Sequence, residues 1–361
     1  MKVLHLPSSV AGNSWGLSRG ERALGLESDV LVLYESRYGY PADRVLFPGN
    51  PPGPAGKLLK RLNIPVLLKE ARAICRSYDV FHFNFGSSLI DLWMLGLPLL
   101  DLPLYRDKGK IIVTYNGCDA RQRDRTIERT RFSPCHNESC SRLCSWGITT
   151  HRNRKGIEKF DRFADTIFAL NPDLMHVLPE RARFLPYTIP RWWDISETPA
   201  RPSSTTLTIA HAPTSRATKG SAIILAALDK LKKTYGDRIE VVLVENVPHD
   251  KALALCRNAD LVIDQVLIGF YGAVAVEAMK MGKPVMAYLR EDDLGFMPGD
   301  MAADCREALI RTDPATIFET LCGIVENPGI LERHREAGLA YVHRWHDPAY
   351  VAGITKAAYE S

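Results

Sequence analysis

The amino-acid sequence predicts an α/β protein of two domains, each built on parallel strands. Short apolar runs typical of strands alternate with helix-like runs along most of the chain. The 361 residues are too many for one ordinary hydrophobic core and suit two. A proline-rich segment, Pro186–Ser204, breaks the alternation near the middle of the chain, and we interpret it as a linker. We therefore expect an N-terminal domain over 1–190, a C-terminal domain over 191–340 and a final helical segment over 341–361.

The first half of the chain contains six expected strands and three expected helices. The strands cover Val3–Leu6, Asp29–Tyr34, Asp79–Phe83, Lys110–Tyr115, Thr166–Leu170 and Arg183–Pro186. The helices cover Leu17–Leu26, Leu58–Arg76 and Ile157–Phe163. Pro65 is expected to kink or interrupt the second helix, because proline lacks the N–H that an interior helical position needs.

The second half repeats the alternation. Its strands are expected over Leu207–His211, Ile239–Val244, Leu261–Ile263 and Val285–Leu289. Its helices are expected over Ser221–Thr234, His249–Asn258 and Ala273–Met281. Gly282-Lys283-Pro284 ends the last of these, and the residues after Glu332 are helical apart from a break at Asp347-Pro348.

A glycine-bearing turn, Gly269–Gly272, joins a strand to the helix that begins at Ala273. The first turn of a helix presents unpaired backbone N–H groups and the positive end of the helix dipole, which together suit a diphosphate. Glu277 lies one turn further, where its carboxylate can accept hydrogen bonds from ribose hydroxyls. A strand–glycine–helix sequence occurs in many α/β proteins, so this segment alone does not decide between a nucleotide site and a plain turn.

A second motif follows the strand Leu207–His211. Arg216 and Lys219 stand beside the start of the next helix, and Gly220 follows the lysine. Arginine can hold two phosphate oxygens at once and lysine adds a point charge, so the pair predicts a diphosphate clamp. The alternative is a solvated basic loop.

Together the two motifs resemble the donor site of retaining GT-B glycosyltransferases, glycosyltransferase family four (group 1) in particular. The resemblance is carried by Val276-Glu277-Ala278-Met279, by Met281-Gly282-Lys283-Pro284-Val285 and by the Arg216/Lys219 pair. The family usually reads E-x7-E here, and Glu277 matches its second glutamate. Gly269 stands where the first glutamate, which faces the donor sugar, is expected. Backbone amides near Phe270–Ala273, Tyr271 and Gly272 included, are expected to replace that contact.

The resemblance implies two Rossmann-like domains facing a cleft, with a C-terminal helix that crosses back to the N-terminal domain. It implies that Val247 flanks the nucleotide base and that Gly12 and Gly16 let the backbone approach the donor phosphate. An ordinary turn is the alternative for both glycines.

The resemblance also marks residues on the acceptor side. His82 and Asn84 lie on the strand that, in the family, ends in a histidine near the sugar, and a core histidine is the alternative for His82. Asn116, Asp119 and Arg121 match the family's H-G-x-D-x-R segment, with Asn116 in place of the histidine.

The implied reaction is transfer of a sugar from a nucleotide-diphosphate sugar, with UDP or GDP as the nucleotide, with retention and without a metal at the donor. Arg216, Lys219, Asn84 and His82 are the expected catalytic residues, the two cations stabilising the leaving diphosphate. A nucleotide-sugar epimerase or hydrolase, and a non-catalytic or nucleic-acid-binding protein of the same fold, are the alternatives. No cofactor is required for the chemistry.

Four of the eight cysteines, Cys118, Cys135, Cys140 and Cys144, lie in one polar, arginine-rich stretch near 118–155 that we expect to be an insertion in the N-terminal domain. Four thiolates are enough for a structural zinc, although the spacings differ from a C-x2-C knuckle. Free or disulfide-bonded cysteines are the alternative.

The basic residues of the same stretch suit an anionic acceptor, a lipid headgroup at a membrane surface or nucleic acid, with a solvated face as the alternative. The chain carries 46 Lys and Arg against 42 Asp and Glu, an excess too small to indicate nucleic acid by itself. The chain starts with a strand rather than a charged-then-apolar leader, and its most apolar stretch, Leu89–Leu104, is broken by two aspartates and two prolines. We therefore expect a cytoplasmic protein without a transmembrane segment. Peripheral contact with a membrane surface is compatible with this expectation.

Overall fold

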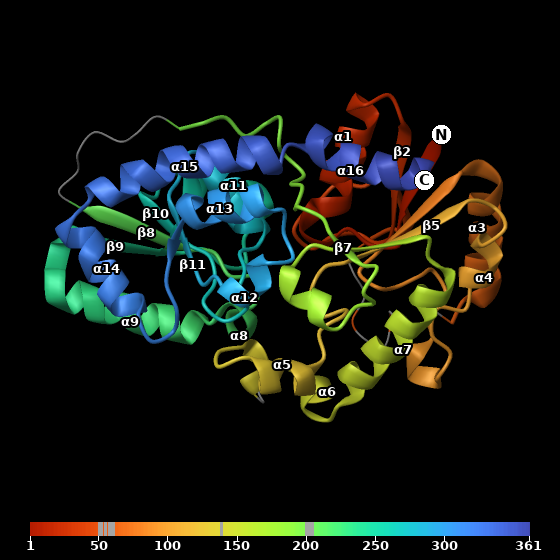
Figure 1. Ribbon diagram of the computed structural model, residues 1–361, viewed down its shortest axis with the longest axis horizontal. Coiled ribbons are helices and arrows are strands. Elements are labelled where there is room, and N and C mark those ends of the chain that lie inside the picture. Colours follow the sequence, from red (N-terminus) through yellow and green to blue (C-terminus); the bar gives the residue numbers. More distant parts are fainter. Residues whose placement is uncertain (50–52, 54–55, 57–61, 138–139, 199–205) are drawn as a thin grey trace. The chain divides into compact units, whose positions relative to one another are not determined.

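The computed structural model describes residues 1–49, 53, 56, 62–137, 140–198 and 206–361, which divide into two α/β units. The first unit consists of Met1–Arg125, Leu143–Pro190 and Pro348–Ser361, and the second of Thr126–Arg142 and Arg191–Asp347. Within the described residues, the first unit contains a seven-stranded sheet and the second a five-stranded sheet (Figure 1).

The sheet of the first unit has the strand order β3-β2-β1-β4-β5-β6-β7, and all its pairs are parallel. Its strands are β1 (Lys2–Leu6), β2 (Glu27–Tyr34), β3 (Arg44–Phe47), β4 (Val80–Asn84), β5 (Lys110–Tyr115), β6 (Thr166–Ala169) and β7 (Arg183–Phe184). Val3 of β1 is in register with Ser28 on one side and Val80 on the other. The chain order reverses between β1 and β4, so the carboxyl ends of these two strands form the switch point where open α/β sheets usually bind ligands.

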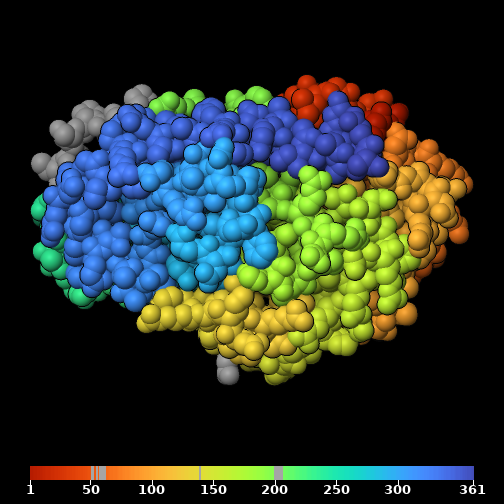
Figure 2. Space-filling view, viewed as in Figure 1, coloured from red at the N-terminus to blue at the C-terminus, as the bar shows by residue number. Residues whose placement is uncertain are grey.

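Helices cover both faces of this sheet. They are α1 (Asn13–Ala23), α3 (Ile64–Ser77), α4 (Leu102–Tyr105), α7 (Ile148–Phe163) and α16 (Pro348–Glu360), with short turns η1 (Val10–Gly12), η2 (Trp93–Leu95) and η5 (Pro172–His176). Buried side chains such as Leu4, Phe83 and Val113 form a core with α3, α4 and α7. On the other face, the C-terminal helix α16 packs against α1 (Figure 2, deep blue against red).

The close contact between α1 and α16 depends on Gly20. A Cβ atom at Gly20 would lie 2.1 Å from the carbonyl oxygen of Pro348, so only glycine lets α16 begin so near α1. The C-terminal helix was expected to start at residue 341. In the structure, the helix that belongs to the first unit starts at Pro348. Residues 341–345 belong to the preceding helix α15.

The sheet of the second unit has the order β12-β11-β10-β8-β9, again with parallel pairs. Its strands are β8 (Leu207–His211), β9 (Ile239–Leu243), β10 (Leu261–Ile263), β11 (Val285–Ala287) and β12 (Leu309–Arg311). Its helices and turns are η3 (Pro134–His136), α8 (Arg216–Lys219), α9 (Ser221–Tyr235), η6 (Gly236–Arg238), α10 (His249–Arg257), α11 (Ala273–Lys280), α12 (Glu291–Leu294), α13 (Gly299–Ala308), α14 (Ile317–Glu326) and α15 (Gly329–Trp345). One face of the sheet packs on α9 and α14 through Ile209, Leu228 and Leu321.

Two further helices, α5 (Arg123–Arg129) and α6 (Arg142–Ser145), contain the residues at which the chain passes from one unit to the other. We expected the whole stretch near 118–155 to belong to the N-terminal domain, whereas the structure groups Thr126–Arg142 with the second unit. Arg129 explains this grouping in part, because its guanidinium lies 2.6 Å from Oδ1 of the fully buried Asp293. The ring of Phe132 also contacts that of Tyr288 edge-on.

The remaining differences from the sequence-based expectations are local. Strands β3 and β12 were not expected, because each is short and shows no clear alternation. Pro65 does not interrupt a helix but lies in the first turn of α3, where its missing N–H has no intrahelical partner to lose. Residues 199–204 of the expected linker and 58–61 of the expected helix lie outside the described residues.

Of the helices described, none combines the length and the apolar character that crossing a membrane would need.

Candidate functional site

The motifs singled out in the second half of the sequence lie at one edge of the second sheet. Strands β8, β9 and β10 are parallel neighbours, and each is followed by a turn and a helix, α8, α10 and α11 respectively. Because the carboxyl ends of parallel strands meet at one edge, the three turns lie together there.

The turn after β8 is held by helix capping and by a glycine. The hydroxyl of Ser215 accepts a hydrogen bond from the backbone N–H of Thr218 and so caps α8. Gly220 has φ +78°, and a Cβ there would lie 2.7 Å from the side chain of Val266. The glycine lets the loop after β10 approach, and the N–H of Val266 donates to the carbonyl of Lys219 at 3.0 Å.

This approach places the ammonium of Lys219 at the start of α11. Its Nζ lies 2.5 Å from Oδ1 of Asp264, and Oδ2 of the same carboxylate accepts the N–H of Gly272 at 2.6 Å. The Asp264 side chain is fully buried and that of Lys219 is 11% exposed, whereas Gly272 and Ala273 are half-buried. The Asp264 carboxylate therefore binds both the Lys219 ammonium and the N-terminus of α11, at a point that solvent can reach.

Arg216 lies on the exposed side of the same turn. Its Nε and a terminal nitrogen bind the two carboxylate oxygens of Glu245 at 2.8 and 2.6 Å. The hydrogen bond from Arg216 lowers the pKa of Glu245, and the same bond raises the pKa of Arg216. To bind a phosphate, the Arg216 guanidinium would therefore have to break its hydrogen bonds to Glu245 or use its remaining N–H groups.

Glu277 lies inside α11, one turn from its start, and is nearly buried. Its Oε1 lies 2.7 Å from Nε2 of His249, the first residue of α10. The ring orients the carboxylate, and the other oxygen of Glu277 can accept a hydrogen bond from a ligand.

The structure explains why position 269 is a glycine and shows where the side chain of Tyr271 lies. Gly269 has φ +81°, and the guanidinium of Arg290 lies 2.8 Å from the position of a Cβ there, so a glutamate would be strained as well as crowded. The ring of Tyr271 is fully buried and its hydroxyl bonds to Tyr341 at 2.6 Å and to His346 at 2.8 Å, so the contact expected of its backbone amide stays a prediction. Val247 is half-buried in the turn after β9, next to Asn246 at φ +54°.

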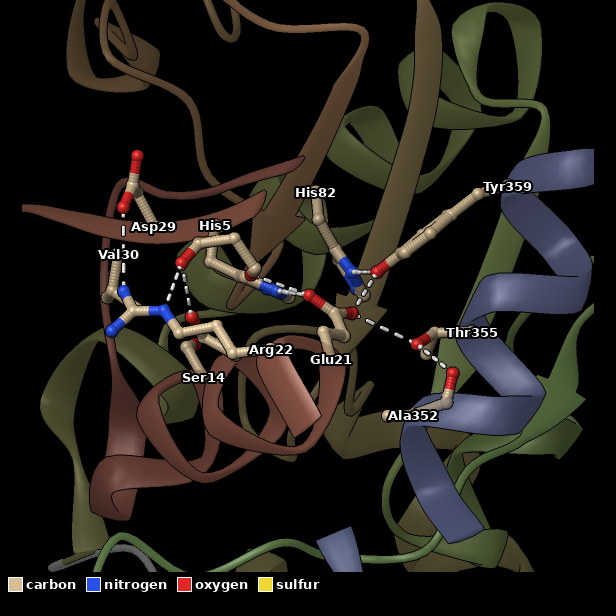
Figure 3. A network of polar contacts seen from close by, with 12 residues as sticks. His5, Ser14, Glu21, Arg22, Asp29, Val30, His82, Ala352, Thr355 and Tyr359 are labelled. Atoms are coloured by element: carbon tan, nitrogen blue, oxygen red, sulfur yellow. Dashed lines mark hydrogen bonds and ion pairs between the residues drawn. The ribbon is translucent and has the colours of Figure 1, made fainter. Parts of the chain in front are cut away.

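In the first unit, His82 is part of a fully buried polar network (Figure 3). Its Nδ1 lies 2.8 Å from the hydroxyl of Tyr359 on α16 and its Nε2 lies 2.6 Å from Oγ1 of Thr114. Burial lowers the pKa of His82 well below its ordinary value. The structure therefore places His82 in the core, the alternative left open by the sequence, and not at a reacting position.

The centre of this network is Glu21 of α1. Its carboxylate binds His5 at 2.9 Å, Ser28 at 2.6 Å, Thr355 at 3.0 Å and Tyr359 at 2.6 Å (Figure 3). Burial by itself would raise the pKa of Glu21, but attraction to His5 and the hydrogen bonds outweigh it and lower the pKa to about 2. Among the described residues, His5, Glu21 and His82 are also the group whose ligand atoms lie near enough to suggest a metal. Hydrogen bonds already engage Nε2 of His5, the Glu21 carboxylate and both ring nitrogens of His82, and Nδ1 of His5 is buried without a partner among the described residues.

Asn84 ends β4 and is also fully buried. Its side-chain nitrogen donates to the carbonyl of His82 at 3.0 Å. Gly12 and Gly16 each lie close to the segment Ile189–Pro190, and the contact expected with a donor phosphate stays a prediction. A Cβ at Gly16 would lie 2.5 Å from the carbonyl oxygen of Ile189, and one at Gly12 would lie 2.5 Å from the ring of Pro190.

The segment Asn116–Arg121 forms a tight turn after β5. The carboxylate of Asp119 accepts the backbone N–H groups of Asn116 and Gly117, and burial raises the pKa of Asp119 to about 6 despite these bonds. Arg121 is buried and binds Asp173 through two hydrogen bonds of 2.6 and 2.9 Å. Arg121 and Asp119 therefore brace the turn, and the side-chain oxygen of Asn116 is buried there without a hydrogen-bond partner among the described residues.

The cysteines are single thiols in the structure. Cys118 and Cys144 belong to the first unit, whereas Cys135 and Cys140 belong to the second. Among the described residues, the group whose atoms lie close enough to hold a metal is His5, Glu21 and His82, and it includes no cysteine. A structural zinc at the cysteines therefore stays a prediction.

Two partners of the predicted site residues did not follow from the sequence, Asp264 as the partner of Lys219 and His249 as the partner of Glu277. No sequence signal links Asp264 to Lys219 or His249 to Glu277, because these pairs are 45 and 28 residues apart and meet only when the strands align.

No family model and no curated protein matches the sequence. Among solved structures, the chain is similar to the catalytic domain of starch synthase IV from Arabidopsis thaliana bound to ADP and acarbose, with a TM-score of 0.61 and 10% identity over 100% of this chain and 99% of that chain. It is also similar to sucrose-phosphate synthase from Thermosynechococcus elongatus, with a TM-score of 0.57 and 14% identity over 100% and 98% of the two chains. A third similar structure is a glycosyltransferase involved in lipopolysaccharide biosynthesis, with a TM-score of 0.53 and 14% identity over 98% and 97%. The chain therefore has the GT-B fold, as expected, and membership of family four stays a prediction.

Proposed function

We propose that this protein is a glycosyltransferase that moves a sugar from a nucleotide-diphosphate sugar to an acceptor. The observation that carries the proposal is the convergence of the Lys219 ammonium, the N-terminus of α11 and the Glu277 carboxylate at one edge of the second sheet. The solved structures of the same fold include three named as glycosyltransferases or synthases, one of them bound to ADP and acarbose.

The diphosphate would bind at the start of α11. An ammonium group has three N–H donors, and Asp264 takes one of those of Lys219, so two remain for phosphate oxygens. The partial positive charge of the helix N-terminus adds to this attraction. Ribose hydroxyls would donate to Glu277, whose orientation His249 holds.

In the reaction, the bond between the anomeric carbon and the diphosphate breaks as the acceptor oxygen bonds to that carbon. The acceptor proton passes to a leaving phosphate oxygen, and the anomeric configuration is retained. Lys219 and the α11 dipole stabilise the negative charge that develops on the leaving group. These groups supply positive charge without a metal at the donor.

A thermal-shift screen with UDP, GDP, ADP and CMP tests the donor site, because a ligand that binds only the folded state raises the melting temperature. An assay for released nucleoside diphosphate, with and without candidate acceptors, then tests transfer. Release that no acceptor accelerates would indicate a hydrolase, and an epimerised sugar nucleotide would indicate an epimerase. Failure of every nucleotide to shift the melting temperature would contradict the proposal.

A further inference from the structure

A short turn in the first unit carries three exposed apolar side chains. Met94 and Leu95 in η2 are 65% and 60% exposed, and Leu97 is 49% exposed. Two backbone hydrogen bonds between Leu92 and Leu97, of 3.1 and 3.2 Å, and the left-handed Gly96 hold the turn in shape. Large apolar side chains on a well-held turn are unusual on a surface that meets only water.

A second turn, immediately before α7, has the same character. Trp146 is 69% exposed, Ile148 is 38% exposed, and Gly147 between them has φ +73°. Met94 and Trp146 line one groove of about 860 Å³, so the two turns are neighbours. Met94, Trp146 and Ile148 therefore belong to one surface, and Leu95 and Leu97 lie in the same turn as Met94.

Helix α7 adds positive charge to this surface. Arg152, Lys155, Lys159 and Arg162 recur at spacings of three and four residues, which places them on one face of the helix. All four line the same groove, where Glu158 is the acidic residue among the lining side chains. The opposite face is buried through Thr150, Asn153, Ile157 and Phe160. Helix α7 lies on the surface of the first unit (Figure 2, yellow-green).

The contacts that these four cations make within the protein do not neutralise all of their positive charge. Lys155 pairs with Glu158 at 2.9 Å, and Arg152 lies 3.5 Å from Asp91 with its guanidinium over the ring of Trp93. The ammonium of Lys159 donates a hydrogen bond to the carbonyl of Pro98. A carbonyl has no net charge, so this bond does not neutralise the positive charge of Lys159. The groove is therefore basic as well as apolar.

We propose that this surface, formed by residues 93–97, residues 146–148 and the basic face of α7, binds an anionic lipid bilayer. Tryptophan and aliphatic side chains would enter the headgroup and upper acyl region, while the lysines and arginines would contact lipid phosphates. The surface and the donor site lie on different units, so this proposal does not depend on the glycosyltransferase assignment.

Other partners fit the surface less well. Nucleic acid would use the cations but would leave Met94, Leu95 and Ile148 exposed to water. A second copy that used the same surface would bring the basic faces of two α7 helices together, and like charges repel.

Co-sedimentation of the full-length protein with vesicles tests the proposal. We expect binding to vesicles of mixed phosphatidylcholine and phosphatidylglycerol, weaker binding at high salt, and little binding to phosphatidylcholine alone. The variant Met94→Ala/Trp146→Ala should lower the partition coefficient for the mixed vesicles at least about tenfold, because it removes two inserting side chains. Lys155→Gln/Arg162→Gln should lower it at low salt and remove most of the salt dependence.

Trp193→Ala is the matched control, since Trp193 is a half-exposed tryptophan of the other unit. All substituted side chains are exposed, and thermal melting checks that each variant folds. Binding that the Met94/Trp146 variant leaves unchanged would overturn the proposal.

Discussion

The ammonium nitrogen of Lys219 lies 2.5 Å from a carboxylate oxygen of Asp264, and the other oxygen of that carboxylate accepts the N–H of Gly272 at 2.6 Å. Asp264 thus binds the two groups that would bind a phosphate. The carboxylate keeps the lysine beside the helix start before any ligand arrives, and a diphosphate must share or replace it. This arrangement leads to the first prediction.

Replacing Lys219 should weaken nucleotide binding. We expect Lys219→Met to raise the Kd for the best nucleoside diphosphate at least about tenfold, because a charge-assisted contact to phosphate is lost. It should also destabilise the fold, since Asp264 is left buried without its partner.

The double variant Lys219→Met/Asp264→Asn separates the two effects. It removes both charges and should recover much of the stability without recovering the affinity, as thermal melting and isothermal titration would show. Lys233→Met is the control, because Lys233 is exposed and pairs with Asp229 one helical turn away. A double variant that binds nucleotide normally would argue against a phosphate contact at Lys219.

Glu277 should matter for the nucleoside and not for the diphosphate. Glu277→Ala removes the acceptor for ribose hydroxyls, and a hydrogen bond to a charged group contributes roughly 1.5–3 kcal/mol. We expect the Kd for a nucleoside diphosphate to rise about tenfold or more, with little change for inorganic pyrophosphate. Equal losses for both ligands would show that Glu277 acts on the whole site rather than on the ribose.

The buried network around Glu21 should make stability depend on pH in acid. The pKa of Glu21 is about 2 in the folded protein, below its ordinary value of 4.5. The ionised form therefore favours folding above pH 4.5, and this contribution is lost as the pH falls from 4.5 through 2. The shift corresponds to a free energy of unfolding on the order of 3 kcal/mol.

Denaturant unfolding of the first-unit signal at pH 7 and at pH 3 measures this effect. Glu21→Gln should be less stable than the unchanged protein at pH 7, and the difference between the two should narrow at pH 3. Glu180→Gln, at an exposed position, is the control. A difference that stays constant across this range would contradict the lowered pKa.

Two glycines inside helices of the first unit should respond to alanine in opposite directions. Gly20→Ala in α1 would place a Cβ 2.1 Å from the Pro348 carbonyl oxygen, so it should destabilise the fold by more than about 2 kcal/mol and loosen α16. Gly156→Ala in α7 meets nothing within 4 Å and should stabilise it by about 0.5–1 kcal/mol. Denaturant unfolding, with hydrogen exchange of the α16 amides, checks both.

Much of the fold follows from local sequence patterns. Apolar runs such as Lys110–Tyr115 and Leu261–Ile263 are strands in the structure, and Gly282 ends α11 as expected. Strands β3 and β12 were missed because each is short and includes an arginine, so neither reads as an apolar run like Leu261–Ile263. The interruption expected at Pro65 was wrong, because a proline breaks a helix only in its interior. In the structure α3 starts at Ile64, so Pro65 lies in the first turn.

The site was predicted in part. The positions of Lys219, Gly272 and Glu277 follow from motifs that each occupy one strand, turn and helix, so short-range sequence was enough to indicate them. The role expected for His82 depended on whether its side chain faces solvent. A neighbour far along the chain, Tyr359, decides this.

The sequence by itself determined the alternation of strands and helices, the division near Pro190 and the motifs at the helix starts, because these depend on residues close together in the chain. Only the tertiary structure decided that Asp264 holds Lys219, that His249 holds Glu277 and that Glu21 binds α16 to α1. The physical reason is that hydrogen bonds and ion pairs form wherever folding brings two groups together. Such contacts join residues 28 to 338 positions apart, over which a single sequence carries no pattern.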